Sequence, residues 1–421
     1  MRRQSRICLP HWFSESICGA GCLPSITGSK NCFSTTLKTS PPSITKSYVL
    51  EASPSSHPLF LHQFHSFRRA WCSMRFLYLS ALFLSSVNAI PRHCRRTDSQ
   101  PVISQAPSNA TAGCSASSSS WQFDDTNHAN ITMGDRSFLV HIPGAYDPSV
   151  PHALVLSFHG FRADDEQQEL ITGFSEPGLT LNGRGIVAVY PNGQFGPGKN
   201  GNESIRAWQG APYSPPGVDD IAFTQQMVQL LSENLCLDSN RFYAAGKSNG
   251  GAFTNLLACT PATASLFAAY APVSPALYAG ANPVDCNPGR PIPIINFHGL
   301  ADTVIPFDGQ TADREGRTEY ATPNITEYRE AWANRNGCAS LPSESPDLGV
   351  FALVSHPHAF TTLKTSNCSA QSNDAVVSGF TVDNLGHSWP TTLGVDGGGV
   401  TAFNATSANI LPFFDAHAFG A

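Results

Sequence analysis

A short glycine-rich stretch around one serine constrains the fold of this chain more than any other feature. An apolar run at 242–245 leads into the pentapeptide Gly-Lys-Ser-Asn-Gly at 246–250, and a helix-compatible run at 252–259 follows. A strand-to-helix turn this tight needs glycine on both sides, because a Cβ there would clash with neighbouring backbone. The pattern predicts a nucleophile elbow that lifts the Ser248 hydroxyl above the edge of a sheet. An ordinary glycine-rich turn is the alternative, so the rest of the chain must supply catalytic partners.

Short apolar runs alternate with helical patterns along most of the chain after residue 121. The runs predict strands at 136–142, 153–158, 186–190, 242–245, 267–273, 292–297 and 376–382. The helical patterns predict a helix that Asp220 caps and further helices at 252–259, 326–336 and 402–417. This alternation predicts the α/β class, a mainly parallel sheet with helices on both faces. Ligands of such sheets bind above the carboxyl ends of the strands.

A nucleophilic serine needs a base that takes its proton and an acid that orients the base. After a nucleophile elbow, the acid comes first along the chain and the histidine second. Asp302 lies in the loop directly after the expected strand 292–297 and is the candidate acid. Asp308 and Asp383 compete with it, and a turn-capping role is its ordinary alternative.

The candidate base is His387, which follows a glycine in the loop after the expected strand 376–382. An imidazole in that loop can reach over the carboxyl edge of the sheet, although a plain surface histidine is the alternative. His356 and His358 lie in an earlier segment and His417 lies in the tail. These three histidines are therefore less well placed for proton transfer to a serine at the elbow.

Two backbone amides are expected to bind the oxyanion that forms during acyl transfer. One is the amide of Asn249, at the start of the helix after the serine. The other comes from the loop after strand 153–158, where Phe161 is the first choice and Gly160 the second.

Two tryptophans, Trp208 and Trp389, could line an aromatic or sugar-binding cleft, and burial in the core is the equally acceptable alternative. Cys18 and Cys22 have a zinc-like spacing, but no second ligand pair follows them. The chain contains no H-E-x-x-H motif and no phosphate loop, so neither a metal nor a cofactor is expected.

Composition excludes some function classes. Only 13% of the 421 residues are charged, the net charge is −6, and no basic run occurs, so nucleic-acid binding is not expected. Low charge together with abundant small polar residues, glycine and proline favours a secreted, loop-rich protein.

The N-terminal part contains a secretory signal pattern. Met74-Arg75 precedes an apolar core that ends near Ala89, so residues 74–89 are interpreted as a signal peptide cleaved after Ala89. Residues 1–73 are then a non-native upstream extension, with a long presequence as the alternative. A flexible Ser/Thr-rich lead-in is expected at 90–120 and the catalytic domain at 121–421.

Cysteines and glycosylation motifs agree with an oxidising compartment. Cleavage after the dibasic pair Arg95-Arg96 would leave an even number of cysteines. They are Cys114, Cys236, Cys259, Cys286, Cys338 and Cys368. Sequence does not select among the fifteen possible pairings, but Cys236–Cys259 and Cys338–Cys368 are plausible, which would leave Cys114 with Cys286. The N-glycosylation motifs begin at Asn109, Asn130, Asn202, Asn324, Asn367 and Asn404.

Several segments together resemble one family. They are 154–160, 236–255, 297–302, 386–390 and 403–406. In sequence and order they resemble the secreted fungal feruloyl esterases, of the carbohydrate esterase family 1 type that is related to polyhydroxybutyrate depolymerases. The resemblance covers roughly residues 114–421 and departs from the family at Ala252, where the elbow usually has a third glycine.

The resemblance implies a disulfide-linked α/β-hydrolase fold with Ser248, Asp302 and His387 as the triad. The implied reaction releases ferulic or related hydroxycinnamic acids from plant cell-wall arabinoxylan. The expected partner is therefore a feruloylated polysaccharide or hydroxycinnamate ester, and we expect a monomer that does not bind membranes. An esterase for acetylated xylan or polyhydroxyalkanoate is the nearest rival. A non-catalytic carbohydrate-binding protein and a secreted peptidase are more distant ones.

Overall fold

The computed structural model describes residues 109–115, 119–338, 361–366 and 377–420, with only the backbone of 361–366. Several sequence-based expectations fall outside these residues. They concern the extension 1–73, the signal 74–89, the Cys18/Cys22 pair, His356, His358, Asn367 and Cys368.

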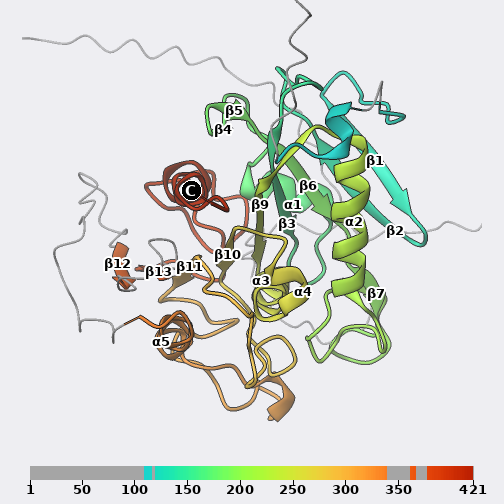
Figure 1. The fold of residues 1–421 in the computed structure, drawn as a ribbon. Coiled ribbons are helices and arrows are strands. Elements are labelled where there is room, and N and C mark those ends of the chain that lie inside the picture. The colour runs from blue at the N-terminus through green and yellow to red at the C-terminus, as the bar shows by residue number, and fades with distance from the viewer. Residues whose placement is uncertain (1–108, 116–118, 339–360, 367–376, 421) are drawn as a thin grey trace, which may run out of the picture. The chain divides into compact units, whose positions relative to one another are not determined.

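One large sheet organises the described part of the chain (Figure 1). Its strand order is β1-β2-β6-β3-β9-β10-β11-β13-β12. The strands are β1 His128–Met133, β2 Arg136–His141, β3 His152–Phe158, β6 Val187–Pro191, β9 Leu237–Lys247, β10 Ala269–Val273, β11 Ile294–Gly299, β12 Thr361–Ser366 and β13 Val377–Val382. All neighbours from β6 to β13 are parallel, whereas β1, β2 and β12 pair antiparallel at the two edges. The expected mainly parallel sheet is confirmed, and the order is that of the α/β-hydrolase fold.

Helices cover both faces of this sheet, as the alternation of patterns predicted (Figure 1). The helices are α1 Asp165–Thr172, α2 Asp220–Asn234, α3 Asn249–Cys259, α4 Pro261–Ala264, α5 Ile325–Arg335 and α6 Leu411–Ala416, which follows a π-helical turn at Thr406–Ile410. Apolar side chains of α2, α3 and α5 share one buried cluster with the sheet, and those of α1 and α6 share another. No described helix combines the length and the apolar character that crossing a membrane requires.

Strand β9 illustrates why the central strands read as continuous apolar runs. Phe242 and Ala244 belong to the cluster on the α3 face, and Tyr243 and Ala245 belong to the cluster on the α6 face. Successive side chains of a strand point to opposite faces, so a strand covered on both sides must be apolar at every position.

The sequence patterns missed β1, α1 and β12, and they misplaced one helix cap. Strands β1 and β12 are edge strands, and their alternating polar residues give a weak apolar signal. Helix α2 is capped by Asp219, whose carboxylate accepts from the Ala222 amide at 2.9 Å, and not by Asp220. The Asp220 side chain is fully buried and pairs with Arg136 at 2.8 Å.

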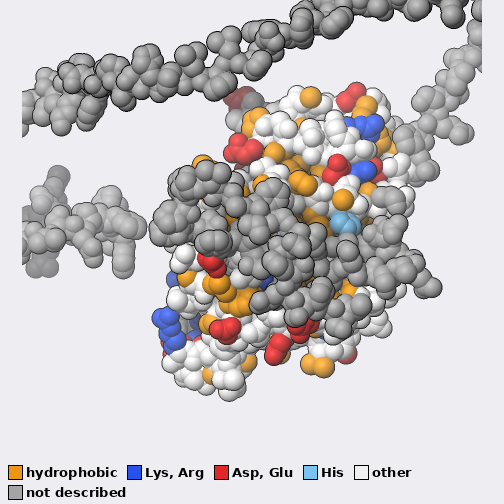
Figure 2. Space-filling model, turned by 90° about the vertical axis from the view of Figure 1, so that its left-hand side faces the viewer, with side chains coloured by type: hydrophobic (Ala, Val, Ile, Leu, Met, Phe, Trp, Pro, Cys, Tyr) orange, Lys and Arg blue, Asp and Glu red, His pale blue; other side chains and the backbone are white. Residues whose placement is uncertain are grey.

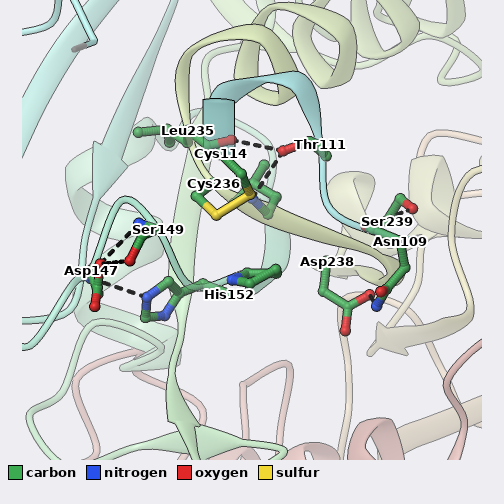
Figure 3. Close-up of a disulfide and its surroundings, with 12 residues drawn as sticks. Asn109, Thr111, Cys114, Asp147, Ser149, His152, Leu235, Cys236, Asp238 and Ser239 are labelled. Atoms are coloured by element: carbon green, nitrogen blue, oxygen red, sulfur yellow. Dashed lines mark hydrogen bonds between the residues drawn. A yellow bond between two sulfur atoms is a disulfide. The ribbon is translucent and has the colours of Figure 1, made fainter. Parts of the chain in front are cut away.

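The disulfide pairing differs from the one favoured by the sequence. Cys114 is bonded to Cys236 (Figure 3), and Cys259 is bonded to Cys286, so the pairs Cys236–Cys259 and Cys114–Cys286 were wrong. Cys236 directly precedes β9 and Cys259 ends α3, but each is bonded to a cysteine outside the strands and helices that the sequence predicted. Cys338 is also disulfide-bonded.

Part of the expected flexible lead-in is packed against the domain. The Thr111 amide donates to the Leu237 carbonyl at 2.9 Å, and the Thr111 hydroxyl donates to the Leu235 carbonyl at 2.8 Å (Figure 3). Together with Cys114–Cys236, these bonds hold residues 109–115 beside the start of β9. The composition of residues 90–120 predicted a flexible segment, because composition contains no information about such tertiary contacts.

We predict that removing Cys114–Cys236 destabilises the protein more than removing Cys259–Cys286. The two bonds close chain segments of 122 and 27 residues, so the chain-entropy relation gives a difference of about 1 kcal/mol. Each double Cys→Ser variant should lose about 2–5 kcal/mol in free energy of unfolding. Urea denaturation without reductant measures both losses, and an equal or reversed order would contradict the prediction.

Candidate active site

The predicted elbow is a strained turn between β9 and α3. Ser248 has a φ of 57°, a conformation that residues with a side chain rarely adopt. A Cβ on Gly246 would lie 2.4 Å from the Gly250 carbonyl oxygen, and a Cβ on Gly250 would lie 2.1 Å from the Phe158 carbonyl oxygen. Only glycine therefore allows α3 to cross this closely over β9 and β3. The crossing holds the Ser248 backbone at the carboxyl edge of the sheet.

The three residues expected to form the triad lie in one hydrogen-bonded chain. His387 Nε2 is 2.7 Å from Ser248 Oγ, and His387 Nδ1 is 2.7 Å from Asp302 Oδ2. Ser248 follows β9, Asp302 follows β11, and His387 follows β13, so parallel strands deliver all three to one edge. This arrangement can move a proton from the serine hydroxyl to the imidazole.

Asp302 is held as a buried carboxylate. Burial alone would raise its pKa, but hydrogen bonds from His298 and His387 outweigh burial and hold the pKa far below its usual value. Its second oxygen accepts from the amides of Val304 at 2.9 Å and Ile305 at 2.8 Å. The carboxylate thus stays ionised and fixed in orientation, as needed to hold an imidazole in one tautomer.

The surroundings of His387 favour its neutral form. Burial lowers the pKa of the imidazole below its usual 6.5, and the hydrogen bond to Asp302 only partly opposes this effect. The side chain remains 12% exposed. A neutral imidazole with a free Nε2 lone pair is the state that accepts a proton from serine.

The competing candidates lie elsewhere. Asp308 is exposed, and among the described residues neither it nor Asp383 bonds to an imidazole. His417 is buried against α6, where its Nδ1 lies 2.6 Å from the Phe413 carbonyl oxygen. Geometry therefore brings only His387 and Asp302 to the serine within the described part of the chain.

The two amides expected to bind an oxyanion flank Ser248. Asn249 begins α3, and Phe161 follows Gly160, where an added Cβ would lie 3.4 Å from the Ser248 Cβ. Within the described residues, neither amide donates to a protein acceptor. Free amides beside a nucleophile are available to a ligand oxygen.

A buried network fixes the loop that carries Phe161. The Trp208 indole donates to the His159 carbonyl at 2.9 Å, and the Asn249 side chain accepts from the Trp208 amide at 2.7 Å. His159 Nε2 accepts from the Gly193 amide at 2.9 Å, and burial lowers the pKa of this histidine to about 4. His159, whose lowered pKa favours the neutral form at neutral pH, and the Asn249 side chain thus tie the two sides of the elbow together.

The tryptophans do not line a cleft, and the expectation of a substrate-binding role for them was wrong. Trp208 and Trp389 are both fully buried, and each indole N–H bonds inside the protein. The Trp389 N–H donates to the Thr406 hydroxyl at 3.1 Å. The positions of the two tryptophans in the sequence, near a loop glycine and near His387, did not indicate whether their side chains are buried.

An ion pair that sequence reasoning missed joins the histidine loop to the elbow strand. Lys247 Nζ lies 2.7 Å from Asp396 Oδ1, and the other Asp396 oxygen accepts from the Trp389 amide at 2.7 Å. Both charged side chains are almost buried. The pair fixes the segment after His387 to the residue before Ser248. Lys247 stood inside the elbow motif, but no local signal marks Asp396.

The described residues contain no cluster of side chains that could hold a metal ion. Among the predicted glycosylation sites, Asn130 and Asn202 are exposed. Asn324 caps α5 with its side-chain oxygen, Asn404 accepts from the Thr406 amide, and Asn109 donates to Asp238.

An α/β-hydrolase sheet with a strained serine elbow and a hydrogen-bonded Ser–His–Asp chain defines the class of this protein. Feruloyl esterase C of Emericella nidulans is 32% identical over 247 residues, which cover 56% of this chain and 77% of that protein. The chain therefore belongs to the feruloyl esterase family and is an esterase.

Two other relatives extend the comparison. Feruloyl esterase B of Piromyces equi is 30% identical over 216 residues, which are 50% of this chain and only 37% of that protein. A bifunctional acetylxylan esterase/xylanase of Neocallimastix patriciarum is 27% identical over 219 residues, 51% of this chain and 29% of that protein. No protein-family profile matches the chain.

We predict that Gly250→Ala lowers the free energy of unfolding by about 2 kcal/mol or more, because overpacking outweighs the gain of about 1 kcal/mol that alanine brings to a helix. The new Cβ would meet backbone that cannot move without shifting β3. Gly144→Ala is the matched control, since its Cβ would meet only the side-chain nitrogen Nδ2 of Asn127, at 4.0 Å. Urea denaturation of both variants measures the effect, and equal stability would contradict the packing argument.

Proposed function

We propose that this protein hydrolyses hydroxycinnamate esters of plant cell-wall arabinoxylan and releases ferulic or related acids. The observation that carries the proposal is the bonded chain of Ser248, His387 and Asp302 in a member of the feruloyl esterase family. Ester hydrolysis needs a nucleophile, a base and an oxyanion site, and the described residues bring a candidate for each to one edge of the sheet.

In the proposed reaction, His387 Nε2 takes the Ser248 proton while the serine oxygen attacks the ester carbonyl carbon. The Asn249 and Phe161 amides bind the resulting oxyanion, and Asp302 stabilises the imidazolium. Collapse breaks the ester bond, and His387 gives its proton to the departing sugar hydroxyl. Water then attacks the acyl-enzyme with His387 as base, which releases the carboxylic acid and restores Ser248.

We further propose that the mature protein is secreted, monomeric and begins after the signal 74–89, with the catalytic domain at 121–421 and residues 109–115 held against it by Cys114–Cys236. The disulfides Cys114–Cys236 and Cys259–Cys286 support an oxidising compartment. Glycans at the predicted sites, including exposed Asn130, belong to the same proposal. Among the described side chains that are visible in Figure 2, basic and acidic ones are interspersed. These visible side chains form no extended basic surface of the kind that binds nucleic acid.

Hydrolysis of acetyl esters on xylan is the second candidate. The similarity to the bifunctional acetylxylan esterase/xylanase favours it, although that match covers only 29% of the relative. Measuring ferulate and acetate released from one feruloylated, acetylated xylan sample separates the two candidates, because the same triad would serve either acyl group.

We predict that Ser248→Ala lowers kcat/KM for methyl ferulate by at least about 10⁴-fold, since the nucleophile is lost. The variant should also fail to react covalently with a fluorophosphonate probe, while its thermal unfolding stays cooperative. Hydrolysis at more than a few per cent of the unchanged enzyme's rate would refute the assignment of Ser248.

We predict that kcat/KM rises with pH along a limb whose midpoint lies below 6.5, because the pKa of His387 is lowered and only its neutral form accepts a proton. The nearby Lys247 charge contributes to the lowering. Lys247→Met should therefore move the limb to higher pH. Arg241→Met, six residues before Lys247 on β9, removes an equal charge and should leave the limb in place. A limb that Lys247→Met does not move would overturn this account.

A further inference from the structure

A pocket of about 330 Å³ opens beside the candidate active site. Its walls come from the segment between β7 (Gln194–Gly196) and β8 (Ile205–Ala207), from the loop after β3, from the loop after Asp302 and from residues 310–320. Arg162, adjacent to Phe161, and Val304, two residues after Asp302, both line it. The pocket therefore adjoins the loops that carry the proposed oxyanion amide and the triad acid.

The charges lining this pocket are unbalanced. Four basic side chains and two acidic ones line it, in a chain whose net charge is −6. Arg317 is paired with Asp313 and with Glu315 at 2.7 Å, and Arg162 is paired with Glu203 at 2.6 Å. Acidic partners therefore offset the charges of Arg162 and Arg317, and the excess positive charge comes from the other two basic side chains, Lys199 and Arg314.

Lys199 is a half-buried cation of this pocket that lacks an acceptor. Its ammonium lies over the rings of Phe161, Tyr213 and Tyr320, at 5.3, 5.8 and 5.6 Å from their centroids. Within the described residues, no carboxylate or other acceptor reaches it. The Lys199 carbonyl accepts from Arg317 at 2.9 Å, which fixes the backbone. The ring faces only partly compensate the half-buried ammonium for its lost hydration, so a hydrogen bond to a ligand oxygen would stabilise it further.

Phe161 links this ammonium to the proposed oxyanion site. Its amide would hold the ester oxygen, and its ring lies 5.3 Å from Lys199 Nζ. The distance from the ammonium to the oxyanion position is therefore at most the length of the Phe161 side chain plus the distance from its ring to Lys199 Nζ. In a cinnamoyl group, one CH=CH unit and one benzene ring separate the carbonyl carbon from the para substituent. This separation is comparable to the one between the oxyanion position and the Lys199 ammonium.

We propose that this pocket receives the aromatic end of the acyl group and that the Lys199 ammonium donates to its para oxygen, so that Lys199 selects 4-hydroxycinnamoyl esters. The inference rests on the proposed function and adds a specificity-determining residue to it. Tyr278 and Tyr320 contribute apolar lining for a planar ring. A hydrogen bond from a charged donor that only one class of substrate can accept discriminates between substrates.

The test compares Lys199→Met with the unchanged enzyme on methyl ferulate and on methyl cinnamate, which lacks the para oxygen and the 3-methoxy group. Methyl p-coumarate, which keeps only the para oxygen, should lose as much rate as methyl ferulate. Methionine keeps an unbranched apolar stem over the rings but removes the charge. We expect kcat/KM for methyl ferulate to fall about 10-fold or more and that for methyl cinnamate to change less than about 3-fold. Arg335→Met is the matched control, because it removes another cation that lies over a ring, at 5.2 Å from the Trp332 centroid on α5.

Each other outcome has a definite meaning. Equal losses of kcat/KM on both esters would assign Lys199 a structural role. No loss on either ester would show that Lys199 does not contact the acyl group. Both results overturn the inference but leave the proposed function standing. Slower release of ferulate from xylan with unchanged methyl ferulate hydrolysis would place the polysaccharide at Lys199 and also overturn it. If the unchanged enzyme cleaves acetyl esters but no hydroxycinnamate ester, the proposed function and the inference both fail.

Discussion

The close crossing of α3 over the sheet is the constraint on which the rest of the site depends. Gly250 packs against the carbonyl groups of Phe158 and His159 without room for a Cβ, and Ser248 is held at a φ of 57°. This strain is stable because the surrounding strands are buried on both faces and cannot relax. The nucleophile position is therefore set by the core of the domain, and the loops adapt to it.

Loops bring the remaining groups to the serine, and buried polar contacts replace the rigidity that loops lack. Lys247–Asp396 ties the histidine loop to β9, and His159 with Trp208 ties the Phe161 loop to α3. Each tie uses a buried group whose hydrogen bonds are satisfied inside the protein, which makes the alternative arrangements costly. Positioning of this kind reduces the motion that would otherwise separate base from nucleophile.

Charge is used sparingly and near the site. Asp302 is kept ionised by His298, His387 and two amides, while burial keeps His387 neutral. In the nearby pocket, no carboxylate of the described residues pairs with the Lys199 ammonium. The contrast separates two uses of a buried charge: Asp302 is satisfied within the protein and orients a base, whereas Lys199 has an unmet donor that a substrate oxygen can meet.

The sequence by itself determined the mainly parallel sheet, the elbow and the residues after β11 and β13 that meet at Ser248. These features follow from local patterns, because buried strands must be apolar throughout and a tight turn requires glycine. Only the tertiary structure decided the pairing of Cys114 with Cys236, the burial of Trp208 and Trp389, and the contact of Lys247 with Asp396. Each joins residues far apart in the chain or depends on what covers a side chain, and residue spacing carries no information on either.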